Sequence, residues 1–277
     1  MKLGLALGGG GSKGSYQIGV LKALIEEKLI KDLKVVAGTS IGALNACLVM
    51  EKLSFKQMKD IWYQIDNELM FNEMKRFKKD RLGLYEQKKM YEILIENQDK
   101  NALINSTIKG YAVASKIKKV GLRHQIYLSN LEEETFHLNK MEDPHKAVLA
   151  SSSVPIVFGP TKLGDNYYVD GGLLNNLPIN VLVKEKCNVI LTVGLSPGNN
   201  FENYDNDNLI IDFTPKYKLS KTILGSLNFN EIILEERMEQ GYTEASNLIK
   251  KLKEINVIKN GSFNKKIKGI YNYDTLV

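Results

Sequence analysis

The sequence predicts an α/β fold, a single domain whose mainly parallel central sheet is flanked by helices on both faces. Three observations lead to this prediction. Two apolar runs, at 2–7 and 35–37, each end in a glycine-rich turn and lead into a helical pattern. Two later apolar runs, at 188–193 and 209–213, suit further strands of the same sheet. No low-complexity linker or internal repeat divides the 277 residues.

The first strand leads into a glycine-rich loop at 8–14 and then into a helix. Apolar residues recur at helical spacing after this loop, at Ile18, Leu21, Leu24 and Ile25. Two nucleotide-binding interpretations of the loop fit only in part. The dinucleotide fingerprint needs an acidic residue after the second strand, which instead ends in Gly38-Thr39-Ser40. The phosphate-loop pattern needs Gly-Lys-Ser/Thr, whereas the chain has Ser12-Lys13-Gly14.

The second strand leads into Gly38-Thr39-Ser40-Ile41-Gly42 and then into an apolar helical pattern over 41–51. This is the layout of a nucleophile elbow, in which a serine lies on a tight turn between a strand and a helix. Side chains at the two glycines would crowd such a turn. At the start of the helix, free amide groups and the helix dipole would favour an anion developing on Ser40. A Gly/Ser turn that only caps a helix is the alternative interpretation.

The two glycine motifs also make chemical sense together. Consecutive glycines let backbone amides converge on one point near a helix start, and a tetrahedral oxyanion requires such donors. If the first two strands are parallel neighbours, the loop at 8–14 lies beside Ser40. The sequence therefore predicts an oxyanion hole that faces a nucleophile.

The segment after the elbow helix is expected to add a core helix and then a looser connection. Ser54 is the predicted N-cap of the helix. Its core-facing stripe consists of Met58, Ile61, Trp62 and Ile65. From 68 to 85 the pattern loosens, and basic residues mix with aromatic residues and methionines between Met70 and Arg81. We interpret this segment as a candidate lid that contacts anionic lipid, with a solvated connection as the alternative.

The next stretch of the chain gives weaker patterns. A helix is expected at 86–96, and a mixture of helix and loop at 101–119. Residues 125–130 and 135–138 alternate like a pair of antiparallel strands around the acidic stretch 131–134.

A helix start is clearer at Asp143-Pro144, because Asp is a good N-cap and Pro suits the first turn. This helix ends near the three serines Ser151, Ser152 and Ser153. None of these serines has the glycine neighbours of an elbow. We interpret them as small residues that pack beside a site.

A second candidate for chemistry is Asp170, which follows the β-like run 167–169 and precedes Gly171 and Gly172. This pattern places a carboxylate at the carboxyl end of a strand, where open α/β sheets hold their sites. A simple Asp-Gly turn is the alternative. The three histidines, His124, His137 and His145, all precede Asp170. The order Ser, Asp, His of the α/β-hydrolase triad is therefore impossible, and a serine hydrolase built on this chain would need a carboxylate as its direct base.

The part from 196 to 277 is expected to complete the domain, while the motif-bearing core covers about 1–195. Residues 225–252 are largely helical in pattern. Four of their apolar side chains are expected in the core, Ile232, Ile233, Met238 and Leu248. The lysines between Lys250 and Lys268 are interpreted as keeping the end of the chain soluble, with membrane contact as the alternative.

Composition sets outer limits on function. With 43% hydrophobic and 25% charged residues, the chain is typical of a soluble globular protein. A net charge of +6 favours anionic surfaces such as phospholipid, and nucleic acid would fit that number equally well. Cys47 and Cys187 have no metal-ligand spacing and are expected to be buried free thiols. Without an apparent signal peptide or membrane span, the expected location is cytoplasmic, with peripheral membrane contact.

Three motifs occur in the order Gly9 to Gly14, Gly38 to Gly42, and Asp170-Gly171-Gly172. Together they resemble the three signatures of the patatin-like phospholipase family. The stretches 150–155 and 172–178 also resemble bacterial members. Besides the reacting groups, the motif-supporting residues are Gly9, Ser12, Lys13, Gly14, Gly38, Gly42, Gly171 and Gly172. Gly172 occupies a position where many members carry alanine.

The resemblance implies a Ser-Asp dyad, with Ser40 as the nucleophile and Asp170 as the general base. It also implies that the amides of Gly10 and Gly11 hold the oxyanion, and that Lys13 is the basic residue beside that loop. A carboxylate of ordinary pKa, about 4, is a poor base for a serine hydroxyl. We therefore expect Asp170 to be partly desolvated.

The predicted function is a lipid acyl hydrolase of phospholipase A type, which cleaves phospholipid esters through an acyl-enzyme. A non-lipid esterase or thioesterase with the same dyad is the first alternative. A nucleotide-binding regulatory protein that uses the glycine loop is the second. The expected partners are a phospholipid or other acyl ester and an anionic membrane surface, with no nucleic acid. The mechanism requires no metal and no cofactor.

Overall fold

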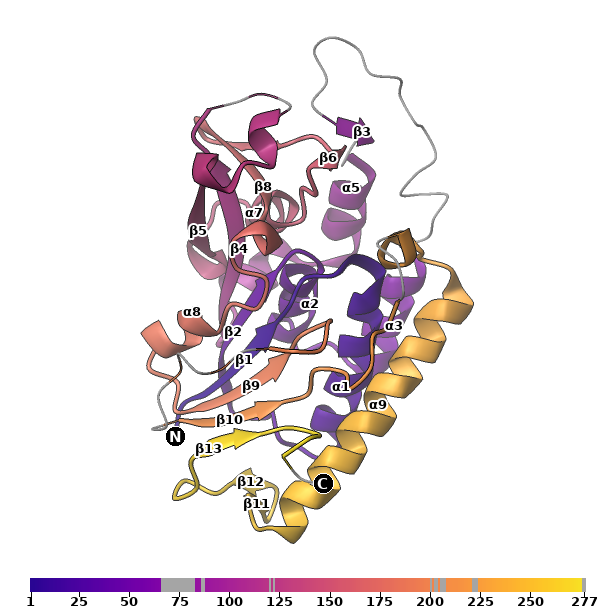
Figure 1. Ribbon diagram of the computed structural model, residues 1–277, viewed down its shortest axis with the longest axis vertical. Helices are drawn as coiled ribbons and strands as arrows, with labels where there is room; N and C mark the ends of the chain where they lie inside the picture. The colour runs from indigo at the N-terminus through magenta and orange to yellow at the C-terminus, as the bar shows by residue number, and fades with distance from the viewer. Residues whose placement is uncertain are drawn as a thin grey trace.

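The computed structural model describes residues 1–65, 83–85, 88–119, 121, 123–199, 201, 204, 208–220 and 224–275. Within these residues, the central sheet has the strand order β13-β10-β9-β1-β2-β4-β8-β7, and β5 also pairs with β4 (Figure 1). The strands of this sheet are β1 (Leu3–Leu7), β2 (Leu33–Thr39), β4 (Lys109–Ile117), β5 (Leu131–His137), β7 (Thr161–Leu163), β8 (Asn166–Asp170), β9 (Val189–Val193), β10 (Leu209–Asp212) and β13 (Gly269–Tyr271).

All neighbours from β13 to β4 are parallel, whereas β8, β7 and β5 join the sheet in antiparallel pairs. The mainly parallel sheet expected from the sequence is therefore confirmed. Two small sheets lie outside it, formed by β3 (Gly83–Tyr85) with β6 (Ile156–Phe158) and by β11 (Ile258–Lys259) with β12 (Ser262–Phe263).

The described helices surround this sheet. The α-helices are α1 (Ser15–Glu26), α2 (Ile41–Met50), α3 (Phe55–Tyr63), α5 (Lys88–Asn97), α6 (Lys100–Ile104), α7 (Pro144–Ser151), α8 (Ile179–Lys184) and α9 (Glu231–Glu254). Short 3-10 turns are η1 (Gly11–Gly14), η2 (Arg123–Gln125), η3 (Leu128–Asn130), η4 (Leu138–Lys140), η5 (Gly171–Leu173) and η6 (Leu224–Leu227). None of these helices is both long enough and apolar enough to cross a membrane.

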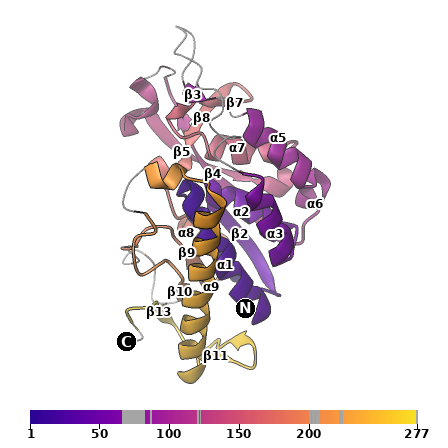
Figure 2. The same cartoon turned by 90° about the vertical axis from the view of Figure 1, so that its right-hand side faces the viewer.

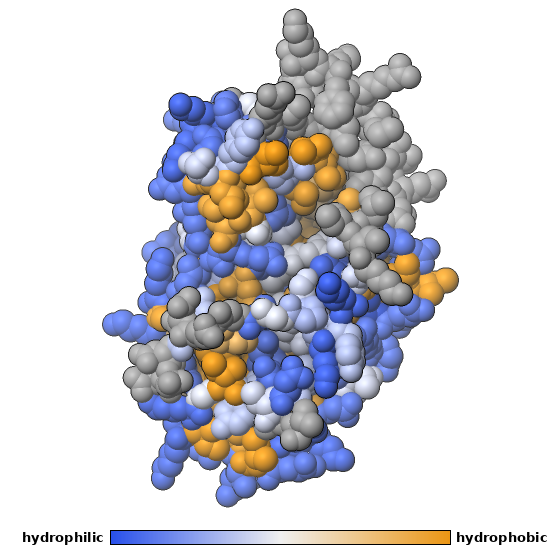
Figure 3. All heavy atoms as spheres, in the orientation of Figure 1, coloured by the Kyte–Doolittle hydropathy of each residue, from blue (hydrophilic) through white to orange (hydrophobic). Residues whose placement is uncertain are grey.

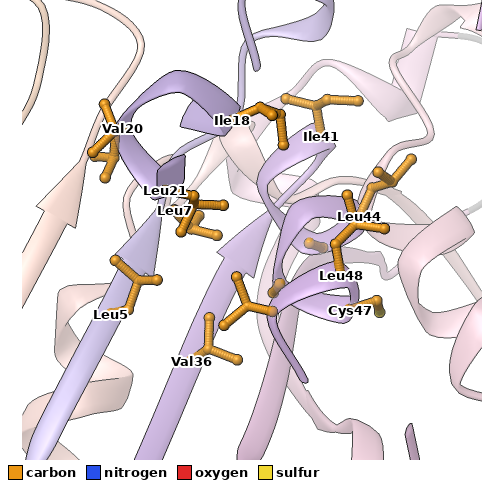
Figure 4. Packing of buried hydrophobic residues seen from close by; sticks show 14 of the residues in the cluster. Leu5, Leu7, Ile18, Val20, Leu21, Val36, Ile41, Leu44, Cys47 and Leu48 are labelled. Carbon is orange, nitrogen blue, oxygen red and sulfur yellow. The ribbon is translucent and has the colours of Figure 1, made fainter. Parts of the chain in front are cut away.

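The two faces of the sheet bury different side chains, because successive residues of a strand point to opposite sides. In β1, Leu5 and Leu7 pack with α1 and α2 in the larger core, as Figure 4 shows, while Ala6 faces a smaller cluster that includes Leu182 of α8. Because both faces of the sheet are covered, the sequences of the parallel strands are continuous apolar runs. Cys47 and Cys187 are buried free thiols within these two cores, as predicted.

The long C-terminal helix α9 lies across α1, as Figure 2 shows. The two helices approach closely because each has a glycine at the crossing. A Cβ atom on Gly19 would overlap the carbonyl oxygen of Met238, and one on Gly241 would overlap that of Tyr16. Close backbone approach of this kind is available only to glycine.

The predicted core stripe of α9 is half right. Met238 and Leu248 are buried, but Ile232 is 68% exposed and Ile233 is only half-buried. The buried positions follow helical spacing through Leu234, Met238, Gly241, Ala245 and Leu248. Ile232 lies outside this stripe, so it faces solvent.

The prediction of helix and loop at 101–119 is wrong for residues 109–117. After α6, Lys109 to Ile117 form β4, an interior strand of the sheet. Residues 112–115 are all buried, since β4 has neighbours on both edges and packing on both faces. An interior strand of small residues lacks the alternation that reveals a half-exposed strand.

The predicted strand pair at 125–130 and 135–138 is also wrong. One strand, β5, spans 131–137 and pairs with β4, while η2 and η3 precede it. The acidic stretch that we placed between the two predicted strands lies inside this strand. Within the described residues β5 has no second neighbour, and charged side chains are common on such edges.

Other local predictions are confirmed. Ser54 caps α3 in a reciprocal capping box with Gln57, and Trp62 and Met58 of that helix are buried. Asp143 caps α7 by accepting a hydrogen bond from the amide of Lys146. The candidate lid at 68–85 lies outside the described residues, apart from the short strand β3.

Candidate active site

Ser40 lies on the predicted elbow, between the end of β2 at Thr39 and the start of α2 at Ile41. Its φ of 56° is in the left-handed region, which is strained for a residue with a side chain. The turn is closed by contacts that tolerate no Cβ. A methyl group on Gly38 would overlap the carbonyl of Gly42, and one on Gly42 would overlap that of Leu7.

Asp170 reaches the elbow by a route that the sequence did not reveal. As predicted, it lies at the carboxyl end of a strand, since it is the last residue of β8, but this strand runs antiparallel to β4. Thr39 of β2 lies opposite Val113, and Asp170 lies opposite the next residue, Ala114. The carboxyl ends of β2 and β8 therefore meet head to head along β4, because the two strands run in opposite directions.

This meeting places the serine and the carboxylate in direct contact. Ser40 Oγ donates a hydrogen bond of 2.5 Å to Asp170 Oδ2, the length typical of a hydroxyl bound to a carboxylate. The other carboxylate oxygen accepts from the amide of Gly172 at 2.7 Å. Ser40 is 6% exposed and Asp170 is 7% exposed. Both are buried but remain reachable from solvent.

Burial changes the acidity of this carboxyl group. Desolvation raises the pKa of Asp170 to about 6, although the hydrogen bonds from Ser40 and from the Gly172 amide act in the opposite direction. The expected desolvation of Asp170 is thus present in the structure. A carboxylate with this pKa is ionised at neutral pH and is more basic than an exposed one.

The glycine-rich loop passes beside the serine. A Cβ on Gly9 would lie 3.0 Å from Ser40 Cβ and 2.7 Å from Asn176 Oδ1. The amide of Gly8 donates to Val193 at 3.0 Å, and that of Gly9 donates to Asn176 at 3.0 Å. Two amides of the loop are therefore engaged by the protein and cannot cradle a phosphate.

The next glycines are confined by the C-terminal part of the chain. Gly11 has a φ of 59°, and a Cβ there would overlap the carbonyl oxygen of Ser226. A Cβ on Gly10 would lie 3.0 Å from the side chain of Leu195. The loop therefore requires glycine at position 11, whereas a side chain at position 10 would press against those of Leu195 and Lys13.

The remaining motif residues divide between the site and its support. Gly171 packs against β4, where a Cβ would overlap the carbonyl of Val113, and a Cβ on Gly172 would lie 2.9 Å from Asp170 Oδ1. Gly14 packs against Ile41 at the start of α2. Gly9, Gly171 and Gly172 thus lie at the dyad, while Gly14 joins the loop to the helix behind it.

Ser12 and Lys13 do not contact the dyad. Ser12 is buried, and its Oγ accepts a 2.8 Å hydrogen bond from Arg237 of α9. Lys13 Nζ donates to Ser196 Oγ at 3.3 Å. Burial, and then the charge of Arg237, lower the pKa of Lys13. Two cations therefore lie close together behind the loop.

Sequence reasoning missed the importance of Arg237. Its side chain is 6% exposed and also donates to the carbonyl of Gly225 at 3.0 Å. A single arginine on an amphipathic helix gives no signal that it points inward, because arginine on a helix is usually exposed. Only the packing of α9 against the loop reveals its position.

Ser151 and Asn176 had no individual roles in the sequence analysis. Ser151 was one of three serines, and Asn176 lay within the stretch 172–178. Ser151 Oγ accepts from the amide of Ser40 at 2.8 Å and donates to the carbonyl of Val113 at 2.5 Å. It thus ties the elbow to β4, in line with the interpretation of the serines as small residues beside a site. Asn176 contacts the loop through its backbone and donates from its side chain to Gly9 at 3.3 Å.

A buried polar network supports the loop from below, and it was also missed. Gln17 Nε2 donates to the carbonyls of Gly8 and Val193, both at 2.9 Å. Its Oε1 accepts from Asn45 at 2.8 Å, and Asn45 Oδ1 accepts from Trp62 at 2.9 Å. Buried polar groups that satisfy one another in this way rigidify the structure around them.

No metal site accompanies the dyad. In the part of the chain that the structure describes, no three His, Cys, Asp or Glu residues gather closely enough to hold an ion.

Comparison with known proteins identifies the family of this chain. The family model described as patatin-like phospholipase matches residues 5–183, which include both Ser40 and Asp170. The chain belongs to the patatin-like phospholipase family. Among solved structures, VipD from Legionella pneumophila has the same fold, with a TM-score of 0.50 and 14% identity. That similarity covers 90% of this chain and 66% of VipD.

Several relatives have similar sequences. A probable lipid hydrolase of Invertebrate iridescent virus 6 is 26% identical over 65% of this chain and 63% of its own length. The uncharacterized protein YqhO of Bacillus subtilis is 30% identical over 68% of this chain and 69% of its own. A lysophospholipase, NTE1 of Debaryomyces hansenii, is 26% identical over 69% of this chain but only 12% of its own length. The chain thus spans less than two thirds of the viral relative and a small part of the yeast enzyme.

Proposed function

We propose that this patatin-like protein is a lipid acyl hydrolase of phospholipase A type that cleaves carboxylic esters through Ser40 and Asp170. The observation that carries the proposal is the 2.5 Å hydrogen bond between the two side chains at a strained elbow. The names of the relatives, a probable lipid hydrolase and a lysophospholipase, support lipid esters as the substrate class.

The reaction would proceed in two steps. Asp170 accepts the proton of Ser40 Oγ as this oxygen attacks the ester carbonyl carbon. When the tetrahedral intermediate collapses, Asp170 returns the proton to the departing alcohol, and an acyl-serine remains. Water then attacks the acyl-serine, with Asp170 as the base, which releases the fatty acid and restores Ser40. The raised pKa of Asp170 makes removal of the proton from Ser40, and later from water, less unfavourable.

The amides of Gly10 and Gly11 are proposed to hold the negative oxygen of the intermediate. They follow Gly9, whose backbone packs against Ser40, and they precede α1. The position of Ser40 at the start of α2 adds the positive end of a second helix dipole. Fixed donors of this kind favour the charge that develops in the transition state.

The experiment that tests this proposal measures hydrolysis of phosphatidylcholine vesicles and of a short soluble ester. The wild type is compared with Ser40→Ala, and Ser106→Ala is the control, since it removes a hydroxyl that binds Met50 at the far end of α2. We expect Ser40→Ala to lose both activities by about 10³-fold or more, while its circular dichroism spectrum is unchanged. Ser106→Ala should retain them.

Two outcomes would contradict the proposal. Retained activity in folded Ser40→Ala would exclude this serine as the nucleophile. Cleavage of the soluble ester without any cleavage of phospholipid would identify the protein as a non-lipid esterase.

A further inference from the structure

The connection between β4 and β5 holds three consecutive large hydrophobic side chains in solvent. The exposed fractions are 47% for Ile126, 52% for Tyr127 and 58% for Leu128. Scattered exposed hydrophobic residues are ordinary, but a consecutive run of them on a folded surface usually has a function.

This connection is a closed loop. The amide of Lys118 donates to the carbonyl of Asn130 at 2.9 Å. The side chain of Asn130 accepts from the amide of Lys119 at 3.0 Å and donates to the carbonyls of Lys119 and His124, both at 2.9 Å. These bonds fasten the base of the loop, so its apolar top is presented in a defined position.

The second projection is a single hydrophobic side chain, Ile156, which is held by a strained turn. Ile156 is 42% exposed and has a φ of 70°. A β-branched residue in this region is unfavourable, and such strain is often retained for function. The turn is closed by the hydrogen bond of 2.8 Å from the amide of Phe158 to the carbonyl of Val154. The backbone thus holds an isoleucine in solvent at a cost in stability.

The third projection is Leu174, which is 37% exposed. It follows η5, the short 3-10 turn that begins directly after Asp170. The other two projections also connect to the surroundings of Asp170. Leu131, next to the closed loop, packs with Val169 and Leu173 on either side of Asp170. The amide of Asp170 donates to Ser153, just before the strained turn, at 2.9 Å.

These five residues, Ile126, Tyr127, Leu128, Ile156 and Leu174, are here termed the apolar rim. In Figure 3, hydrophobic side chains gather in the upper half of the molecule, where Figure 1 places β6 and β8. The packing of Leu131, the hydrogen bond from Asp170 to Ser153 and the position of Leu174 after η5 connect the rim to the segments that flank Asp170.

We propose that the apolar rim inserts into the surface of a phospholipid bilayer and that the enzyme takes its substrate from that surface. This inference rests on the proposed function, because it assigns to the same site the physical form of its substrate. Lipid esters reside within bilayers, whereas Ser40 and Asp170 are almost fully enclosed. Seating the rim in the lipid would place the dyad directly above its substrate.

The shape and charge of this surface favour a bilayer over a protein partner. The rim consists of three separate projections rather than one groove, and fluid lipid can close around each of them. Exposed Lys118, Lys119 and Lys162 lie on the loop base and on β7, where they suit phosphate headgroups. Acidic residues also lie on β5, where Glu132 is exposed, Glu133 accepts from Asn175 and Asn180, and Glu134 accepts from Tyr168.

The test measures co-sedimentation with phosphatidylcholine vesicles that contain phosphatidylglycerol, using proteins that carry Ser40→Ala so that the vesicles stay intact. One rim variant combines Ile126→Ser with Leu128→Ser. A second is Ile156→Asn, because asparagine tolerates a positive φ. The control is Ile232→Ser on α9, which removes a side chain with 68% exposure that lies outside the rim.

We expect each rim variant to weaken vesicle binding by about tenfold or more, while Ile232→Ser binds like the parent. With Ser40 restored, the rim variants should lose vesicle hydrolysis by a similar factor and keep their turnover of a short soluble ester. Circular dichroism confirms that each variant is folded.

Vesicle binding that is unchanged in both rim variants would overturn the inference. So would a change of oligomeric state in sedimentation velocity, because the rim would then join two copies of this chain. Failure of the proposed function looks different. In that case the wild type would hydrolyse neither substrate, while vesicle binding would still depend on the rim.

Discussion

The family-matched part of the chain, 5–183, and the part that follows it contribute to the site in different ways. The matched part supplies both members of the dyad, and its elements meet through close backbone contacts. Gly42 against Leu7 and Gly171 against Val113 are examples, since neither contact leaves room for a Cβ atom. The contribution of the matched part can therefore be recognised in the sequence from short glycine motifs.

The C-terminal part supplies no side chain to the dyad, yet it shapes the loop that faces the dyad. Leu195 and Ser226 confine Gly10 and Gly11, and Arg237 binds Ser12 from α9. These contacts come from single residues on different elements, so no sequence motif predicts them. The difference teaches that the reacting groups are local in sequence, whereas the support of their surroundings is distributed.

The largest expected effect tests the matched part. Asp170→Asn should lower kcat for ester hydrolysis by about 10³-fold, because the amide cannot accept the proton of Ser40. The amide can still accept from Gly172 and donate to Ser40, so the fold should be unchanged. Steady-state kinetics with circular dichroism measures both properties. Activity within tenfold of the wild type would remove Asp170 from the role of base.

The next effect tests the C-terminal part. Arg237→Met removes the donor that binds Ser12 Oγ and one of the donors to the carbonyl of Gly225, which keeps a 3.3 Å hydrogen bond from Ser12 Oγ. Because a small displacement of the loop misplaces its amides, we expect kcat to fall by about tenfold to 100-fold. KM should change little, and Arg237→Lys should recover part of the loss. A change confined to thermal stability, with normal kcat, would show that Arg237 only supports the fold.

A smaller effect separates packing from chemistry. Alanine in the middle of a helix usually stabilises it relative to glycine by about 1 kcal/mol. Gly241→Ala should do the opposite and lower the free energy of unfolding by about 1–3 kcal/mol, because its Cβ overlaps the carbonyl of Tyr16. The folded fraction should keep its kcat. Urea denaturation measures the difference, with the exposed Glu239→Ala on the same helix as the control.

The last prediction concerns pH and stability. Burial raises the folded-state pKa of Asp170 from 3.8 to about 6, so the folded state binds more protons than the unfolded state between these values. This carboxyl group therefore lowers the free energy of unfolding as pH rises from 4 to 6, by up to about 3 kcal/mol.

Asp170→Asn removes this effect. It should raise the melting temperature relative to the wild type at pH 8 and leave it nearly equal at pH 3.5. Thermal denaturation of both proteins at the two pH values measures the difference. An equal difference at both values would mean that ionisation of Asp170 does not destabilise the fold.

Much of the fold was predictable wherever one local signal dominated. The elbow around Ser40 followed from two glycines between an apolar strand and an apolar helix, and Asp143-Pro144 marked the start of α7 correctly. The prediction was wrong at β4, whose four consecutive buried residues at 112–115 show no alternation. Interior strands are specified by their neighbours on both faces, which a single segment does not record.

The sequence by itself determined which groups could react. An elbow serine, a later Asp-Gly-Gly and the position of every histidine before Asp170 excluded the Ser, Asp, His order of the α/β-hydrolase triad and pointed to a carboxylate as the proposed base. Such features are local, because a turn type or a missing residue can be read without knowing the contacts.

Only the tertiary structure decided how these groups meet. The antiparallel direction of β8 brings Asp170 onto Ser40, and the crossing of α9 over α1 buries Arg237 against Ser12. Strand direction and helix crossing depend on free energies summed over many distant contacts. No single stretch of the sequence determines these free energies. Strand direction and helix crossing are therefore known only from the folded chain.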